Sequence, residues 1–461
     1  MKNKKSSPLL LSIKTFGLLC MFILTVVSLT SCTSPGYPMP PRTRIPTRLE
    51  GRHLDTTWTS VEAGFVSNFD EWDSEPGRIT SFALQSDGSL VAWGANESGQ
   101  IGNGQTTAWN EFAIRPISIL EDVLLVSTSN EHTMAIKSDG SLWAWGSNAS
   151  GQLGDGGESE RRNRPFQIMD DIAVVSAGGT HTLAIKSDGS LWAWGSGGRD
   201  QFGDSTEDQQ LTPAWIMDDV VAISAGSRHS MAITSDGSLW AWGDNASGQL
   251  GDGSTGDRLT PTHVMDDVVA VSAGNEHTLA ITIDGNLWSW GNNSSGQLGD
   301  GTTEDRHRPV RIMSDVDDIS VGRWHSMAIR SDGSLWSWGS NRNDQLGIRS
   351  GNRPKPTWIM DDVIATSAGE SGTLAISEDG SMWFWGRDWI AQEGDDIYFV
   401  YRSNFGFALL MILFFLFAIT TIPPGIIVII ILLVRWWLRK NKPIFKKPYK
   451  FNYSKISKNS F

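Results

Sequence analysis

The sequence predicts an all-β protein: a seven-bladed β-propeller of four-stranded antiparallel blades, with an N-terminal signal peptide and a C-terminal transmembrane helix. Three observations support this. Asp-Gly pairs recur at intervals of 47 to 52 residues, no helical period appears in residues 44–386, and long apolar runs occur only near the two ends. The pairs begin at Asp87, Asp139, Asp188, Asp236, Asp284, Asp332 and Asp379.

Each repeat reads as four short strands. In the unit that starts at Pro309, PVRIM and DDISVG are β-prone, HSMAIR alternates before Ser-Asp-Gly-Ser, and LWSWG alternates again. Asp-Gly between two alternating runs is typical of a hairpin, because glycine takes the positive φ that the turn needs. Seven such units predict seven blades. In the first unit, Pro46–Gly51 and Val61–Gly64 are the expected opening strands, and the former should pair with the last blade to close the ring.

The motif within the repeat is more specific than its period. The pattern H-[ST]-[LM]-A-I-x-x-D-G-x-L-W-x-W-G is followed by SGQLGDG and then a proline, with GQLGDG at positions 151, 248 and 296. This pattern resembles the regulator of chromosome condensation (RCC1-like) repeat family over about residues 44–386. The resemblance implies a propeller. The family's best-known activity is nucleotide exchange on a nuclear GTPase, which an exported chain could not reach, and the chain also resembles an exported propeller that inhibits β-lactamases.

The N-terminus is typical of a bacterial lipoprotein. Four lysines precede an apolar run from Thr15 to Val27, which is followed by Leu29-Thr30-Ser31-Cys32. We predict a signal peptide over residues 1–31, acylation of Cys32 and a proline-rich tether over residues 32–43. An uncleaved anchor or an ordinary signal peptide remains the alternative.

The C-terminus is typical of a membrane span. Residues 405–434 are 30 residues without a charge, long enough for a transmembrane helix that Pro423 and Pro424 should kink. Residues 387–404 form the expected juxtamembrane linker. Residues 435–461 carry nine Lys or Arg and no acid, which favours a cytoplasmic tail. The predicted location is therefore the bacterial cell membrane, with residues 44–386 forming an extracytoplasmic propeller.

Five histidines recur seven residues before their Asp-Gly pairs, at His132, His181, His229, His277 and His325. Equivalent positions in separate blades lie apart, whereas a metal needs its ligands around one point. We therefore assign these histidines a structural role at the start of a strand, over metal binding or general-base catalysis. The paired tryptophans of the WxWG strands share one face, so we expect them to pack between blades rather than form a ladder for sugars.

Nothing in the sequence predicts a cofactor, a metal site or a catalytic site. The loops GDGSTGD and GDGTTED offer Asp252, Asp257, Asp300 and Asp305 as calcium ligands, but they lack the EF-hand spacing, and Asp-Gly is typical of turns. We find no P-loop, nucleophile elbow, paired catalytic carboxylates or His-Glu zinc motif. A glycan-active enzyme that uses Glu131, Glu276 and Glu370 is a less favoured alternative.

Strand alternation separates two faces. The turns between the first and second strands and between the third and fourth strands should lie on one face and are nearly identical in all units. The loops between the second and third strands, and the long GQLGDG crossings, should lie on the other face, where the units differ. A variable surface on a rigid frame is typical of recognition. The candidate binding residues on this loop face are Arg323, Trp324, Arg228, Glu276, Glu131, Phe69 and Trp72, with a plug of the channel as the equal alternative for the aromatic residues of the first unit.

These features favour a membrane-anchored recognition scaffold that binds an extracytoplasmic protein or a surface polymer, besides the lipid bilayer that holds its ends. Between the two basic ends the chain carries 51 acids and 25 basic residues, a net charge of −26, which argues against binding nucleic acid. A structural envelope component is the main alternative.

Overall fold

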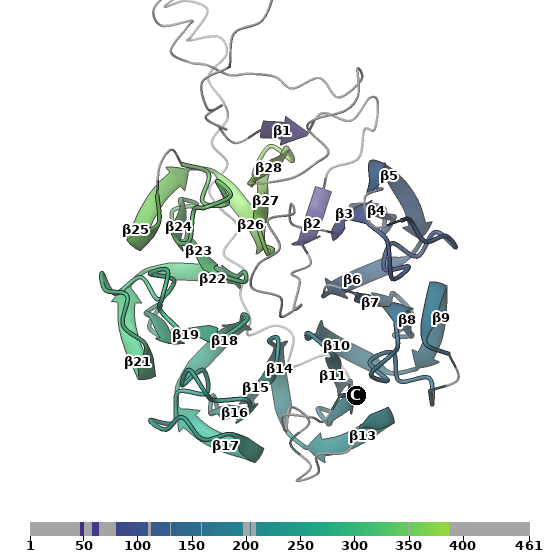
Figure 1. Cartoon of the computed structure of the whole chain (residues 1–461), viewed down its shortest axis with the longest axis horizontal. Coiled ribbons are helices and arrows are strands. Elements are labelled where there is room, and N and C mark those ends of the chain that lie inside the picture. Colours follow the sequence, from purple (N-terminus) through teal and green to yellow (C-terminus); the bar gives the residue numbers. More distant parts are fainter. Residues whose placement is uncertain are drawn as a thin grey trace, which may run out of the picture. The chain divides into compact units, whose positions relative to one another are not determined.

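The protein is a seven-bladed β-propeller. The computed structural model describes residues 47–49, 58–63, 80–108, 112–129, 131–157, 159–196, 203, 209–348 and 351–386. Twenty-eight strands form seven four-stranded antiparallel sheets around a central axis, as Figure 1 shows. The predicted propeller class is confirmed. Among the described residues, none forms a helix with the length and apolar character of a membrane span. The predicted signal peptide, tethers, span and tail lie outside the described residues.

Each blade runs from an innermost strand beside the axis to an outermost strand at the rim. In this order, blade 1 is β2 (Trp58–Ala63), β3 (Thr80–Gln85), β4 (Leu90–Ala95) and β5 (Phe112–Leu120); blade 2 is β6 (Val123–Thr128), β7 (His132–Lys137), β8 (Leu142–Ser147) and β9 (Arg161–Met169); blade 3 is β10 (Ile172–Ala177), β11 (His181–Lys186), β12 (Leu191–Gly195) and β13 (Gln210–Met217). Blade 4 is β14 (Val220–Ala225), β15 (His229–Thr234), β16 (Leu239–Gly243) and β17 (Arg258–Met265).

Blade 5 is β18 (Val268–Ala273), β19 (His277–Thr282), β20 (Leu287–Gly291) and β21 (Arg306–Met313), and blade 6 is β22 (Val316–Val321), β23 (His325–Arg330), β24 (Leu335–Gly339) and β25 (Arg353–Met360). Blade 7 is β26 (Val363–Ala368), β27 (Gly372–Ser377), β28 (Met382–Gly386) and β1 (Thr47–Leu49).

Sequence repeat and blade are offset by one strand. The first strand of each repeat forms the outer edge of the preceding blade, so β9 belongs to blade 2 although its repeat continues into blade 3. The offset ties each blade to the next through one covalent repeat. It also makes β1 the outer strand of blade 7, where Thr47 to Leu49 pair with Phe384 to Met382 of β28. The expected ring closure is therefore observed.

Tryptophans of the WxWG strands fill the spaces between blades. Trp194 is fully buried against Met134, Leu142 and Leu153 of the preceding blade, and Trp192 packs against the edge of the same cluster. The Nε1 atom of Trp194 donates to the carbonyl oxygen of Gln152 at 2.9 Å. The expected interblade packing is confirmed, and each large indole finds a partner for its one donor.

Candidate functional site

Five histidines, each at the start of the strand that follows a variable loop, form hydrogen bonds between neighbouring blades. The Nε2 atom of each of the five repeated histidines lies 3.0 to 3.1 Å from a Thr or Ser hydroxyl of the next blade. His277, for example, contacts Ser326 Oγ at 3.0 Å, and that hydroxyl donates to the carbonyl oxygen of Gln297 at 2.8 Å. Because the Ser326 hydroxyl already donates its proton to Gln297, it accepts from His277, so Nε2 of His277 carries the ring proton.

Burial keeps these histidines uncharged. Each imidazole is fully buried, and burial lowers the pKa of His277 to about 3. Among the described residues no three His, Cys, Asp or Glu side chains gather closely enough to hold a metal ion. The hydrogen bonds of these histidines join each blade to the next.

On the loop face, Arg323 and Trp324 form an ordered pair. The guanidinium of Arg323 lies over the ring of Trp324, 5.7 Å from its centroid, and its Nη1 donates to Glu370 Oε1 at 2.7 Å. Glu370 belongs to the corresponding loop of blade 7, so the ion pair joins two neighbouring loops. Both charged side chains are largely buried, at 22% and 17% exposure. Partners hold these two side chains in place before any ligand arrives.

The other predicted loop residues have separate local partners. Arg228 lies 4.0 Å from Asp244, and Glu276 accepts hydrogen bonds from Ser247 Oγ at 3.3 Å and Asn292 Nδ2 at 3.2 Å. Burial raises the pKa of Glu276. Glu131 is partly buried at the equivalent loop of blade 2. Phe69, Trp72 and Cys32 lie outside the described residues.

Two of the three loop glutamates considered for an enzyme, Glu276 and Glu370, have different partners. Glu276 faces polar groups of blades 4 and 5, whereas Glu370 is bound to Arg323. Within the described part of the chain, these bonds hold Glu276 and Glu370 at separate loops, each with its own partners. Each of these two carboxylates therefore has polar partners of its own, which differ between the two loops.

The aspartates of the GDG loops organise the loops themselves. Asp300 accepts from Arg306 at 2.8 Å and from Thr302, and Asp252 binds Arg258 and Ser254 in the same way. Asp305 accepts from the backbone N–H of Asn293 at 2.7 Å. These oxygens already have donors, which is the arrangement expected of a turn rather than of a calcium cage.

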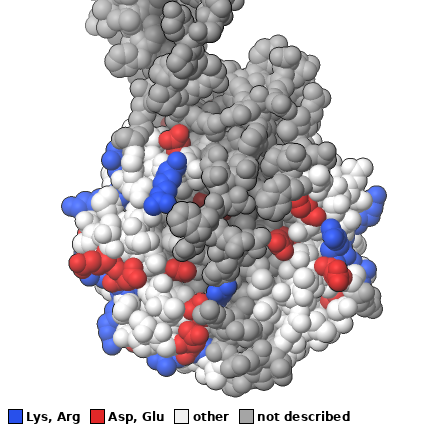
Figure 2. All heavy atoms as spheres, viewed as in Figure 1, with Lys and Arg blue, Asp and Glu red and all other residues white. Residues whose placement is uncertain are grey.

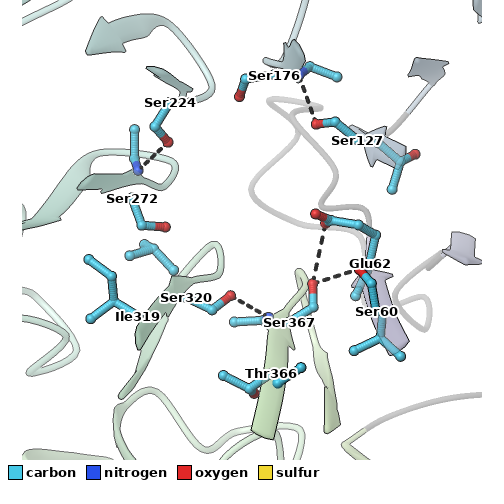
Figure 3. Close-up of a pocket in the computed structure, with 18 of the residues that line it drawn as sticks. Ser60, Glu62, Ser127, Ser176, Ser224, Ser272, Ile319, Ser320, Thr366 and Ser367 are labelled. Carbon is cyan, nitrogen blue, oxygen red and sulfur yellow. Dashed lines mark hydrogen bonds between the residues drawn. The ribbon is translucent and has the colours of Figure 1, made fainter. Parts of the chain in front are cut away.

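A ring of hydroxyl groups lines the central channel. One serine from the innermost strand of six blades faces the channel, and Figure 3 shows them around a common space; they are Ser127, Ser176, Ser224, Ser272, Ser320 and Ser367. Most of them accept a hydrogen bond from a backbone N–H of the next blade, as Ser224 does from Ala273 at 2.9 Å. The volume of this open cavity is about 330 Å³.

Blade 1 breaks this ring with an acid. Glu62 stands at the serine position, and its Oε2 atom accepts a hydrogen bond from Ser367 Oγ at 3.5 Å (Figure 3). Burial raises the pKa of Glu62 to about 8, while the hydrogen bond from Ser367 lowers it and the charge of Asp318 raises it. Asp318 lines the same channel from blade 6. Burial raises the pKa of Asp318 to about 6, since the channel wall replaces part of its hydration although water still reaches it.

These two channel acids are functional candidates that the sequence alone did not single out. The signal was present in the repeat itself: the first unit reads VEAG where later units read VSAG, and the sixth reads DDISVG where the fifth reads VAVSAG. Glu62 and Asp318 both depart from the repeat, and this departure would have identified them if the channel positions had been known. The sequence does not show which positions face the channel.

The face opposite the loops, which we call the turn face, carries most of the acid. It consists of the Ser-Asp-Gly turns and the Met-Asp-Asp turns, which meet through hydrogen bonds such as Val268 N–H to Gly237 O at 2.9 Å. Its 19 exposed turn acids are Asp87, Glu121, Asp122, Asp139, Asp170, Asp171, Asp188, Asp218, Asp219, Asp236, Asp266, Asp267, Asp284, Asp315, Asp332, Asp361, Asp362, Glu378 and Asp379. The four described basic residues beside them are Lys137, Lys186, Arg311 and Arg330.

Local hydrogen bonds keep the turn aspartates ionised. The hydroxyl and the backbone N–H of Ser141 lower the pKa of Asp139, and Ser190 has the same effect on Asp188. In the Met-Asp-Asp turns the second acid takes a left-handed conformation, with φ of 62° at Asp219 and 61° at Asp267, which aspartate adopts more readily than most residues. Turn geometry and negative charge therefore come from the same residues.

The loop face has nearly balanced charge by comparison. Its 13 described acids are Glu97, Glu131, Asp155, Glu160, Asp244, Asp252, Asp257, Glu276, Asp300, Glu304, Asp305, Asp344 and Glu370. Its 11 described basic residues are Arg161, Arg162, Arg164, Arg228, Arg258, Arg306, Arg308, Arg323, Arg342, Arg353 and Lys355. In the view of Figure 2, blue and red side chains lie beside one another around the blades. The excess negative charge of the described propeller therefore belongs to the turn face.

An apolar collar, as we call it, stands at the turn-face ends of four of the seven innermost strands. It consists of Leu124, Val221, Val269 and Ile364, each the second residue of an innermost strand and each more than half exposed. A β-bulge occurs at this residue, as the register shift between Val268 and Ala270 shows. A bulge redirects a side chain out of the regular alternation, which explains how four branched apolar residues come to lie in solvent.

Comparisons with known proteins agree with this architecture. The family model described as RCC1-like domain matches residues 61–357. Mouse protein RCC2 is 38% identical over 82 residues, which are 17% of this chain and 15% of RCC2, so the match spans less than a fifth of that relative.

Two solved structures share the fold. Human WBSCR16 has a TM-score of 0.61 at 20% identity, covering 77% of this chain and 94% of that one. Prp20p from Saccharomyces cerevisiae, whose structure was described with its binding properties to Gsp1p and histones, has a TM-score of 0.58 at 19% identity, covering 74% and 93%. The repeat motif, the seven closed blades and the family model lead to one conclusion: the chain belongs to the RCC1-like domain family.

Proposed function

We propose that this propeller is a membrane-anchored, extracytoplasmic recognition scaffold whose loop face binds a protein or a surface polymer. RCC1-like propellers serve as protein-interaction scaffolds, and the related Prp20p is described with binding to Gsp1p and histones. The membrane location rests on the apolar ends and on the Cys32 box of the sequence.

One observation supports the choice of the loop face. The variable loop residues directly precede the repeated histidine, which is hydrogen-bonded to the next blade. Trp324 precedes His325, whose Nε2 lies 3.0 Å from Thr373 Oγ1 of the next blade. Arg323 is held by Glu370 and lies over the Trp324 ring. An aromatic and a guanidinium that are already ordered lose little entropy on binding, and both are residue types that dominate interface energies.

The test uses the full chain with its ends intact, expressed in a bacterium and crosslinked in living cells. We expect Arg323→Ala combined with Trp324→Ala to reduce crosslinked partner by at least about tenfold, which corresponds to the loss of one hot spot. Trp358→Ser, which removes an exposed tryptophan of the outer strand β25, is the matched control and should retain the partner. Equal capture by the loop variant would refute the site.

The anchors need a separate measurement. We expect mass spectrometry of the membrane fraction to find lipid on Cys32, and external protease to reach the propeller but not residues 435–461. A propeller that external protease cannot reach in intact cells would contradict the extracytoplasmic assignment without bearing on the loop site.

A further inference from the structure

The turn face combines features that the proposed loop site does not use. Its collar of Leu124, Val221, Val269 and Ile364 exposes four branched side chains at the turn-face ends of innermost strands. Exposed apolar residues on one face can contribute to an interaction surface when charged groups around them favour a partner. The collar is also a product of the fold, because it assembles residues from four blades at equivalent bulges.

The charge around the collar selects the kind of partner. Nineteen acids and four basic residues surround it on the described turn face, whereas the loop face is nearly balanced. An apolar surface set in such a field repels acidic proteins and anionic lipid headgroups and attracts cationic chains. Hydrogen bonds from Ser141 and Ser190 lower the pKa of Asp139 and of Asp188, and the nearby Lys137 and Lys186 lower them further.

The channel extends this chemistry inward. In blade 6 the residue at the collar position is Asp317 instead of an apolar residue, and Asp318 follows it. Asp318 lines the channel, and Glu62 lies two strand positions deeper, at the level of the serine ring. A side chain that enters the channel from the turn face therefore meets Asp318 and then Glu62.

We propose that the turn face is a second docking surface, which binds a lysine- or arginine-rich polypeptide segment. Apolar side chains of the segment cover the collar, and one basic side chain enters the channel mouth towards Asp318. A long basic side chain suits this entry, because its aliphatic stem passes apolar residues while its head keeps polar partners. The surface is distinct from the loop face and does not depend on the proposed function of that face.

The test measures binding of a fluorescent peptide of six lysines and two leucines to the full chain in detergent, by fluorescence anisotropy. We expect Val269→Ser combined with Ile364→Ser to weaken binding by roughly tenfold, from lost apolar contact. Asp318→Asn, which removes the charge that faces the channel, should weaken it by a similar factor. Glu160→Gln combined with Glu304→Gln, which removes two exposed acids from the loop face, should leave it unchanged.

Three outcomes would overturn the proposal. The first is equal weakening by the loop-face pair, which would mean diffuse attraction to an acidic protein. The second is binding that the collar pair does not change. The third is collar-dependent binding of phosphatidylcholine vesicles in place of the peptide, which would assign the face to a lipid surface. The thermal midpoints of all variants are compared with that of the parent chain, so that a folding defect is not read as lost binding.

Discussion

The channel acid Glu62 gives the sharpest prediction about stability. Six blades place serine at this position, whereas blade 1 places a carboxyl group whose pKa burial raises to about 8 from an ordinary 4.5. Between these two values the unfolded chain has released the proton and the folded chain still holds it. The folded state therefore loses stability as pH rises from about 4.5 to about 8, and the loss then levels off.

The size of the effect follows from the shift. Each pH unit in this window corresponds to ~1.4 kcal/mol, so the cost at pH 7 approaches ~3 kcal/mol. Glu62 retains some access to the solvent of the channel, and this screening reduces the expected cost to about 2 kcal/mol. Glu62→Gln removes the titration and keeps the shape, and Glu62→Ser restores the residue of the other blades.

The assay is urea denaturation of the parent chain and both variants from about pH 5 to about pH 8, followed by tryptophan fluorescence. We expect the variants to equal the parent near pH 5 and to be more stable by about 2 kcal/mol near pH 7. A difference that stays constant across this range, or that grows as pH falls, would refute the assignment of a buried, protonated Glu62.

Two further predictions concern the frame. His277→Ala removes a fully buried imidazole and its bond to Ser326, so we expect it to lower the free energy of unfolding by about 2 to 4 kcal/mol. The control, His263→Ala on an exposed outer strand, should change this free energy by less than about 0.5 kcal/mol. An equal loss for both variants would contradict the role of His277 in joining two blades. Gly291 has a φ of 100°, and in Gly291→Ala the added Cβ would lie closer than van der Waals contact to the carbonyl oxygen of Glu276, so this variant should lower the thermal midpoint by several degrees. In the control, Gly256→Ala, the Cβ meets no atom within 4 Å, so the midpoint should stay unchanged or rise. An unaltered midpoint for Gly291→Ala would contradict the close approach.

Most of the fold was predictable because the chain repeats one motif seven times. Asp-Gly turns, alternating strands and paired tryptophans each act locally, so the pattern around Asp284 and Trp290 predicts a hairpin without knowledge of its neighbours. The division into two faces followed from alternation alone. The pairing of the first strand with the last blade was also expected, but the sequence does not show that every repeat gives its first strand to the preceding blade.

The candidate sites were less accessible from the sequence. The loop positions of Arg323 and Trp324 stand out as variation, but nothing in the sequence connects them to Glu370. That partner lies 47 residues away in sequence and one blade away in space. Glu62 looks like an ordinary strand residue in the sequence, since its significance depends on facing the axis beside Ser367, 305 residues away.

The sequence by itself determined the number of blades, the turn residues and the chemistry available on each strand, because these depend on contacts between close neighbours in the chain. Only the tertiary structure decided what the ring brings together. Closing seven blades around an axis brings residues of each innermost strand to one channel, and so places Glu62 beside Ser367 with Asp318 lining the same cavity. Convergence of this kind is a property of the closed ring, and no single repeat contains it.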